Sequence, residues 1–203
     1  MPTPKPAYHR ENLKEDLLAA AFAHVEANGH QELSVRQLAQ LVGVSPGAPY
    51  HHFPDRRSLL LAVALAGYDL LTAEAAGTVQ LHLPGAEILA QTCHAFLNFC
   101  HKHSRLIELM YESELTRPLV DPAIKAAQQS GYQVLRNVVL IAAPHLAPAE
   151  MGARIATLWS ALYGFALMRG RQMILPHDEI DERRADGGAD AIVRQLVRMM
   201  TEA

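Results

Sequence analysis

Cysteine is scarce in this 203-residue chain, and neither sign of charge dominates. Two cysteines, Cys93 and Cys100, cannot form the disulfide framework of a small secreted protein, which indicates a reducing, cytoplasmic environment. The N-terminal residues lack the continuous apolar core of a signal peptide. The most apolar stretch, residues 155–168, is about six residues too short for a typical membrane span. We therefore expect a soluble protein with no membrane contact.

The chain is not basic: its net charge is −3 with neutral histidines. Residues 1–60 carry six Lys/Arg against six Asp/Glu, and the acidic excess lies downstream. Nucleic-acid binding through overall composition is therefore excluded, and any contact with DNA must come from a local patch.

Motifs of common enzyme classes are also missing. The sequence contains no glycine-rich phosphate loop, no G-x-S-x-G elbow and no H-E-x-x-H helix. His24 and His145 have no partner in the sequence that would make them catalytic. We therefore expect neither an enzyme nor a cofactor.

Apolar residues make up half of the chain and recur at steps of three and four residues, which is typical of amphipathic helices. This pattern predicts an all-α protein, and the charged, glycine-ended segment 177–190 is predicted to be a connection. The predicted helices cover residues 10–28, 34–42, 45–53, a longer segment capped by Asp55 and ended by the break at 81–85, and then 86–102, 104–115, 122–142, 148–170 and 188–202.

Two short helices near the N-terminus are joined by a tight turn. Ser34 and Gln37 fit a capping box, and Val35, Leu38, Ala39 and Val42 form the buried side of the first helix, which Gly43 ends. Ser45 is expected to cap the second helix. This arrangement is typical of a helix-turn-helix, which places its second helix in the major groove of DNA.

The second helix contains two prolines. Pro46 suits the first helical position, where a missing N–H costs nothing. Pro49 is costlier, because it removes the hydrogen bond to the Ser45 carbonyl and disfavours helical geometry at Ala48. We predict a short helix with an irregular first turn, held in place by Tyr50, Phe53 and the preceding helix.

Residues 32–63 read ELSVRQLAQLVGVSPGAPYHHFPDRRSLLLAV. This stretch resembles the DNA-binding segment of tetracycline-repressor-like (TetR) regulators, with similarity over roughly residues 10–65. The resemblance rests on the Ser34 cap, the Gly43 turn, Gly47 and the Tyr50, His52, Phe53 run. Three positions depart from the family pattern: Val42 replaces alanine, Pro49 replaces a branched aliphatic residue, and Arg56 replaces lysine.

The resemblance implies a set of DNA contacts. Phosphates would be contacted by Ser34, Arg36, Tyr50, His52 and Arg56, and base edges would be faced by Ala48 and His51. Ser45 and Gly47, which lets the duplex approach closely, complete the set. The alternatives are that Tyr50 is a core aromatic and that Arg36, Arg57, His51 and His52 are merely solvated. No arginine lies within the second helix, so modest base selectivity at a dyad-repeated site is expected.

The remainder of the chain is longer than a DNA-binding module needs. The resemblance implies domains 1–54 and 55–203, the second a helical ligand-binding and dimerisation domain. Trp159, Tyr163 and Gly164 match the spacing of a tryptophan-histidine-glycine signature found in some members, with tyrosine in place of histidine. Apolar stripes in the last two helices predict a homodimer through a four-helix bundle. The stripes consist of Ile155, Leu158, Leu162, Phe165 and Ala166, followed by Ile192, Leu196, Met199 and Met200.

A ligand pocket is expected between the middle helices, and the scarcity of charge there favours a mainly apolar or aromatic effector. The alternative is that these aromatics and methionines are ordinary core. The candidate lining residues are Phe96, Phe99, Met110, Tyr111, Tyr132, Trp159 and Tyr163.

The run CHAFLNFCHKH, residues 93–103, offers a metal-binding or redox alternative. Cys93 and Cys100 share a helix face with His94 and His101 one step round. However, the two cysteines are about 10 Å apart along one helix, too far to share one ion or form an intrachain disulfide. Ordinary buried cysteines are the better interpretation.

Together these features predict a homodimeric regulator of transcription, a repressor that a small molecule releases from a palindromic operator. The alternative is a helical ligand-binding or metal- and redox-sensing protein without specific DNA binding.

Overall fold

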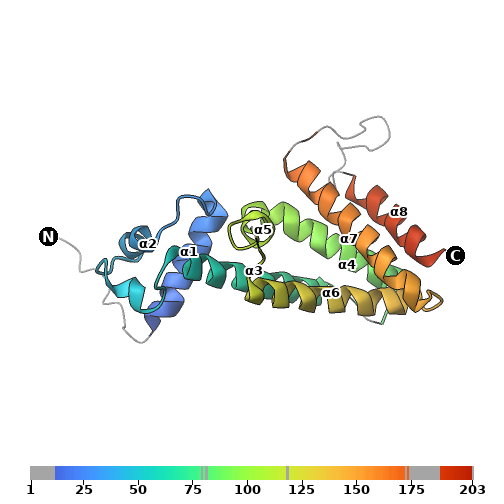
Figure 1. Ribbon diagram of the computed structural model, residues 1–203. Coiled ribbons are helices and arrows are strands. Elements are labelled where there is room, and N and C mark those ends of the chain that lie inside the picture. Colours follow the sequence, from blue (N-terminus) through green and yellow to red (C-terminus); the bar gives the residue numbers. More distant parts are fainter. Residues whose placement is uncertain are drawn as a thin grey trace. The chain divides into compact units, whose positions relative to one another are not determined.

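The computed structural model describes residues 12–78, 80, 82–117, 119–171, 173 and 188–202. Within these ranges the protein contains eight α-helices, one short 3₁₀ helix and no strand, which confirms the all-α prediction (Figure 1). The elements are α1 (Leu13–Asn28), α2 (Val35–Val42), η2 (Ala48–His51), α3 (Arg56–Thr78), α4 (Gly85–Lys102), α5 (Ser104–Glu112), α6 (Pro122–Ala142), α7 (Pro148–Gly170) and α8 (Ala189–Thr201).

Two compact units divide the chain. The first comprises the described residues of Met1–Gly67 and Arg105–Ile124, and the second comprises those of Tyr68–Ser104 and Lys125–Ala203. The domain boundary predicted between residues 54 and 55 stays a prediction, and by compactness residues 55–67 group with the N-terminal unit. The first turns of α3, and α5 from a distant part of the sequence, belong to the N-terminal unit. Most of the predicted connection 177–190 lies outside the described residues.

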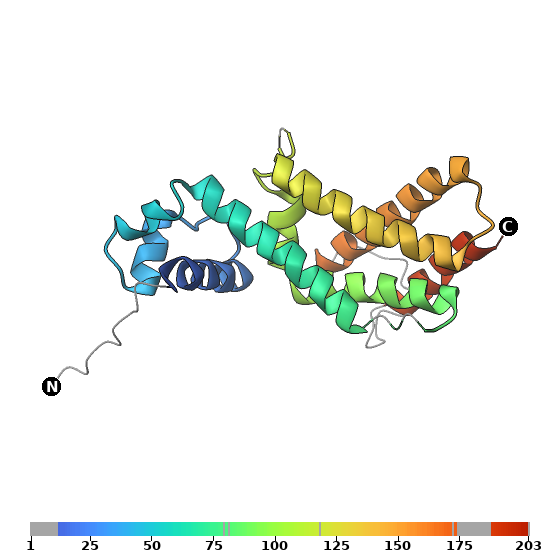
Figure 2. The ribbon, with the colours of Figure 1, turned by 90° about the horizontal axis from the view of Figure 1, so that it is seen from below.

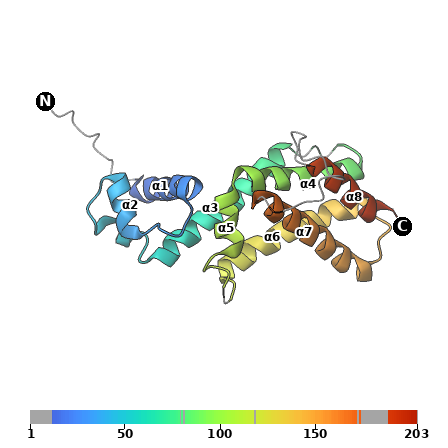
Figure 3. The same ribbon diagram turned by 90° about the horizontal axis from the view of Figure 1, so that it is seen from above.

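The N-terminal unit begins with two helices that end at glycines. The helices α1 and α2 (Figure 3) are each followed by a glycine: Gly29 has φ 83°, and Gly43 has φ 77° and ψ 31°, conformations that favour glycine. The buried side of α2 is the predicted one: Val35, Leu38, Ala39 and Val42 are all buried. They share the core of this unit with Leu17, Ala21, Val25, Leu33, Phe53, Leu59 and Leu60.

Gly67 marks a close approach of α3 to α5. A Cβ atom at this position would lie 2.8 Å from Met110 Sδ and 3.1 Å from Leu106 Cδ1, and both of those side chains are fully buried. The absence of a side chain at residue 67 therefore lets α5 pack tightly into the N-terminal unit.

In the second unit, α4 packs against both α7 and α8 (Figure 1). The apolar stripes predicted to face a partner subunit largely face this core instead. The stripe of α7 is almost fully buried within the single chain, because its residues pack inward. On α8 only Met199, 49% exposed, remains prominently open to solvent. The buried stripe residues are Ile155, Leu158, Leu162, Phe165, Leu196 and Met200.

The beginning of α4 meets the end of α6 backbone to backbone (Figure 2). A Cβ atom on Gly85 would lie 2.5 Å from the Ile141 carbonyl oxygen and 2.7 Å from Ala142 Cα. Only glycine permits this contact without moving a backbone segment.

The stretch Arg56–Gly77 in α3 is long and apolar enough to cross a membrane by length and composition, so the sequence-based choice of residues 155–168 as the most apolar stretch was wrong. Burial accounts for part of this apolar character: Leu59, Leu60 and Val63 are fully buried, and 33% of the apolar window is buried within the protein.

Candidate nucleic-acid interface

Ser34 starts α2 as predicted. Its backbone is extended, and its hydroxyl accepts a 3.1 Å hydrogen bond from the Gln37 amide, which satisfies one of the unpaired donors at the helix start. Arg36, in the first turn, is exposed. The half-buried Ser34 and the exposed Arg36 thus begin a polar edge on the N-terminal unit.

The turn after α2 is closed by three hydrogen bonds. The Gly43 amide donates to the carbonyls of Ala39 and Gln40, and the Val44 amide donates to Ala39 at 3.0 Å. This is a Schellman arrangement, which requires the left-handed conformation seen at Gly43. It ends α2 abruptly and turns the chain toward η2.

The expected recognition helix is a single 3₁₀ turn, η2. Pro49 explains this geometry, because it has no N–H to donate to the Ser45 carbonyl, four residues back. That carbonyl accepts instead from the Ala48 amide at 3.0 Å, a 3₁₀-type bond. The expected irregular, short helix is confirmed. The expected Ser45 cap and Pro46 first position were wrong, since η2 begins at Ala48 with Gly47 as its cap.

Two buried side chains hold η2 on the unit. Pro49 and Phe53 are buried, and the amides of His52 and Phe53 both donate to the Pro49 carbonyl at 2.9 Å. α1 and α2 both contact η2. A four-residue helix would not persist alone, so this packing is what fixes the segment.

With Pro49 and Phe53 buried, the polar side chains of the same segment face the solvent. Tyr50 is 48% exposed, which rules out the alternative that it is a core aromatic. Ala48 is half-buried, as Ser34 is. The predicted DNA-contacting residues that are exposed are Arg36, Ser45, Gly47, Tyr50, His51 and His52.

Asp55 caps α3, as predicted. Its Oδ1 accepts from the Ser58 amide at 2.7 Å, and the Asp55 amide donates to Ser58 Oγ at 3.3 Å. These hydrogen bonds from Ser58 hold the pKa of the Asp55 carboxyl below its ordinary value. The cap fixes where α3 begins, directly after the exposed segment.

Arg56 is engaged within the N-terminal unit. Its guanidinium donates to the carbonyl oxygens of His30, Gln31 and Leu33 and pairs with Glu114. The sequence offered no signal for this contact, because Glu114 lies 58 positions away and no local pattern connects the two residues. The predicted phosphate contact of Arg56 competes with these partners.

The predicted ligand residues are divided between the two units. Phe96, Trp159 and Tyr163 meet in the second unit, with ring centroids 4.7 Å apart for Phe96–Trp159 and 6.1 Å for the stacked Trp159–Tyr163 pair. Phe99 is buried beside His103, and Tyr132 is 42% exposed on α6. Met110 and Tyr111 belong to the first unit.

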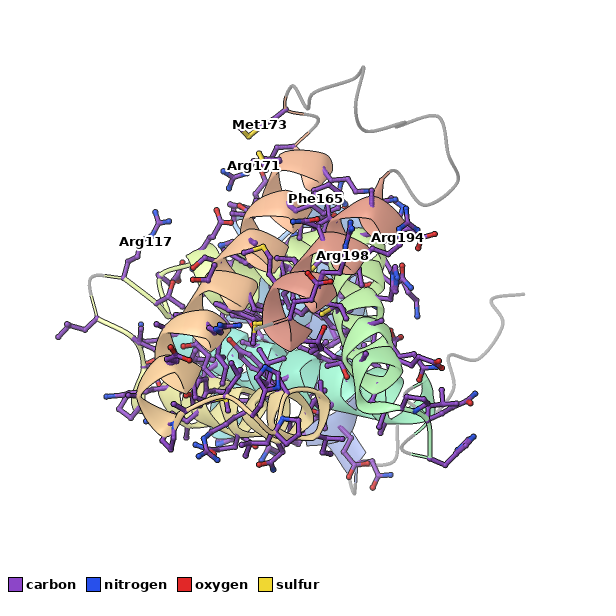
Figure 4. All side chains as sticks on the ribbon, turned by 90° about the vertical axis from the view of Figure 1, so that its right-hand side faces the viewer. Arg117, Phe165, Arg171, Met173, Arg194 and Arg198 are labelled. Atoms are coloured by element: carbon purple, nitrogen blue, oxygen red, sulfur yellow. The ribbon has the colours of Figure 1, made fainter. Side chains whose placement is uncertain are left out.

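An open depression on the second unit contains none of those seven residues. It is lined by Ala90, Arg194, Val197 and Arg198, from α4 and α8, and Figure 4 labels the two arginines on α8. The structure therefore separates the aromatic cluster from this basic surface feature.

Cys93 and Cys100 are buried free thiols, and burial raises the pKa of each to about 12. Thiols of this kind react slowly, because the thiolate is the nucleophile and the metal ligand. Across the described residues, no group of three or more His, Cys, Asp and Glu side chains could hold a metal ion. These findings favour the interpretation of ordinary core cysteines.

Two family models match the chain. The model of the tetR family of bacterial regulatory proteins matches residues 17–63, and that of the tetracyclin repressor-like C-terminal domain matches residues 89–200. The first match covers the exposed segment around η2, and the second covers most of the helical region beyond it.

Two curated regulators are similar over part of their length. The transcriptional activator FasR of Mycolicibacterium smegmatis is 25% identical over 122 residues, which cover 60% of this chain and 56% of FasR. The transcriptional repressor AcnR of Corynebacterium diphtheriae is 37% identical over 51 residues, which cover 25% of this chain and 27% of AcnR. The chain thus spans about half, or less, of the length of these relatives.

Solved structures share the fold over almost the whole chain. A Rhodococcus sp. RHA1 protein of unknown function is 26% identical with a TM-score of 0.80, covering 98% of this chain and 100% of that one. BioQ bound to its double-stranded DNA operator is 23% identical with a TM-score of 0.57, covering 91% of this chain and 97% of BioQ. At that identity the second likeness concerns the fold alone.

Proposed function

The chain belongs to the tetracycline-repressor (TetR) family of bacterial regulators, and from this premise we propose that it binds a palindromic operator and regulates transcription in the cytoplasm. The observation that carries the proposal is the exposed, anchored segment around η2. Tyr50, His51 and His52 are open to solvent while Pro49 and Phe53 fix the segment from behind.

The division of labour on this surface follows from chemistry. Ser34, Arg36, Tyr50 and His52 are proposed to contact phosphates, which give affinity and register. Ala48 and His51 are proposed to face base edges, with Ser45 and Gly47 completing the contact surface. A four-residue element without arginine reads few bases, so two copies on one duplex are required for a useful affinity.

A homodimer through α7 and α8 supplies the second copy in this proposal. The proposed contact face of α7 differs from the one predicted from the sequence, because the apolar stripe of α7 is buried in the core of its own chain. The opposite face of α7 carries small exposed residues that allow two helices to approach closely: Gly152, Ala153, Ala156, Thr157 and Ser160.

The proposed effector is a small, mainly apolar or aromatic molecule that contacts the cluster of Phe96, Trp159 and Tyr163. Trp159 and Tyr163 are half-buried and stacked, which offers a flat surface to an aromatic ring. Since α3 belongs to both compact units, an effector that shifts α3 would change the placement of η2. We propose release of DNA, as in a repressor; the activator FasR shows that a relative has the opposite role.

The decisive experiment selects bound sequences from random duplex DNA with purified full-length protein at near-physiological salt. We expect a palindrome whose half-sites are about 10 base pairs apart, one turn of the duplex. A folded protein that enriches no sequence, with or without candidate effectors, would contradict specific regulation.

Two variants then test the proposed surface on the selected operator. Arg36→Gln should lower the slope of log affinity against log salt by about 0.9, because one phosphate contact is lost. Tyr50→Phe should weaken binding several-fold without changing that slope, because its hydroxyl is uncharged. Tyr132→Phe, which alters a similarly exposed tyrosine on α6, is the matched control and should have no effect.

A further inference from the structure

A continuous polar network crosses the N-terminal unit from the start of α6 to the start of α2. Asp121 Oδ1 accepts from the Ala123 amide at the first turn of α6, and Asp121 Oδ2 pairs with Arg57 at 2.9 Å. Arg57 also donates to the Glu114 carbonyl oxygen at 2.9 Å. The Glu114 carboxylate in turn pairs with Arg56.

Arg56 ends the network on the backbone just before Ser34. Its Nε donates to the Leu33 carbonyl at 2.8 Å, and its Nη2 donates to the carbonyls of His30 at 2.7 Å and Gln31 at 3.1 Å. With one Nη1 donor on Glu114, four of the five guanidinium donors have partners. These carbonyls belong to the turn that delivers Ser34, the cap of α2.

We propose that Arg56 is a positioning residue rather than a phosphate contact, and that it couples the α5–α6 turn to the start of α2. The position of residues 113–121 then sets the position of the Ser34 cap, and through α2 that of the exposed segment. The proposal rests on the proposed function for its DNA readout, and its structural part is measurable without DNA.

The side-chain chemistry supports positioning over phosphate binding. A guanidinium spreads its donors over three nitrogens in a plane, so it can hold carbonyls and a carboxylate on different sides at once. A lysine ammonium presents three donors at a single point and cannot span the same partners. Arginine in place of the family's usual lysine is therefore suited to linking two chain segments by hydrogen bonds, whereas either residue can bind a single phosphate.

The variant Glu114→Gln distinguishes a phosphate-binding role of Arg56 from a positioning role, because the two roles predict opposite changes in operator affinity. If Arg56 binds phosphate, Glu114→Gln releases it and removes a negative charge near DNA, so operator affinity rises or stays constant. If Arg56 positions the α2 cap, Glu114→Gln weakens the link between Arg56 and the α5–α6 turn, and operator affinity falls by about three- to tenfold. Glu114 is 44% exposed, so the variant is expected to fold.

The matched control is Glu32→Gln, which removes the same charge from an exposed position in the same unit. We expect it to leave operator affinity unchanged or slightly raised. Arg56→Lys, which keeps the charge, should weaken binding to a similar extent as Glu114→Gln. Affinity of the Arg56→Lys protein equal to wild type, or a rise for Glu114→Gln beyond that of Glu32→Gln, would overturn the proposal.

A measurement on the free protein separates this proposal from the regulatory function. Hydrogen exchange at the amides of residues 30–38 should be faster in Arg56→Lys and Glu114→Gln than in wild type and Glu32→Gln. Unchanged exchange in that segment in both variants would contradict the positioning role of Arg56 even if operator binding were established. Faster exchange in the two variants of a protein that selects no operator would support the positioning role and contradict the proposed function alone.

Discussion

The Ser45 carbonyl oxygen accepts a 3.0 Å hydrogen bond from the amide of Ala48, where an α-helix would have taken its bond from residue 49. Residue 49 is proline, which has no N–H, so the chain closes a tighter 3₁₀ turn. One substitution relative to the usual family pattern thus determines the form of the element proposed to meet the bases.

Replacing Pro49 with valine should restore an α-type turn. The new amide can donate to Ser45, and valine is close to proline in volume and suits the buried position. We expect slow hydrogen exchange at the amide of residue 49, and a changed sequence preference in operator selection with an unchanged salt slope. Pro46→Val is the control, because Pro46 is exposed and precedes η2. An identical preference for wild type and Pro49→Val would contradict a role for the 3₁₀ geometry.

Gly85→Ala should destabilise the second unit by about 1–3 kcal/mol, the usual cost of overpacking. Its Cβ would lie 2.5 Å from the Ile141 carbonyl oxygen, and backbone cannot turn aside as a side chain can. Gly131→Ala is the matched control: Gly131 is exposed within α6 with no atom in the way, so alanine should stabilise by up to about 1 kcal/mol. Denaturant unfolding followed by fluorescence of Trp159, the single tryptophan, reports on this unit. Equal stability of the two variants would contradict the close approach.

Cys93 and Cys100 should resist alkylation in the native protein. Because burial raises the pKa of each thiol to about 12, only about one molecule in 10⁴ carries the thiolate at pH 8. Mass spectrometry after iodoacetamide treatment should show two slow sites that become fast in denaturant. Rapid alkylation of either cysteine in the folded protein at pH 8 would contradict this prediction and support the redox-sensing alternative.

Much of the local structure follows from the sequence, because its causes are local. The Ser34 and Asp55 caps, the Gly29 and Gly43 stops and the buried side of α2 each depend on residues within a few positions of one another. The bounds of α6 and α7 agree with the predicted 122–142 and 148–170. The proline-containing segment could be predicted to be short, but its 3₁₀ hydrogen bonding depended on which amide was free to reach Ser45.

Relations between distant segments could not be predicted. The pairing of Arg56 with Glu114, and the contact of Gly67 with Met110, join residues separated by more than 40 positions. A single sequence has no signal for such pairs. The residues expected to face a partner subunit on α7 and α8 were misidentified for a related reason. An apolar helix face has the same sequence pattern whether it packs against its own chain or against a second copy.

His30 should make the stability of the N-terminal unit depend on pH. The ring is buried, and its Nδ1 has no hydrogen-bond partner among the residues that the structure describes. Burial lowers the pKa of His30 below the ordinary value of about 6.5, although Glu108 and Glu114 act in the opposite direction. Between that lowered pKa and 6.5 the unfolded chain binds a proton that the folded chain does not, so stability falls as the pH drops through this window.

The expected loss is about 1.4 kcal/mol for each unit by which the pKa is lowered, and it ends once the pH is below the folded-state pKa. Urea unfolding at pH 7.5 and pH 5.5 measures it. His30→Gln should show a smaller loss between the two pH values than wild type, because the titrating ring is gone, even if it is less stable at both. His51→Gln, at an exposed position beside Tyr50, should keep the wild-type difference. If His30→Gln loses as much stability on acidification as wild type, the buried neutral imidazole is not the source, and the pH dependence arises elsewhere in the chain.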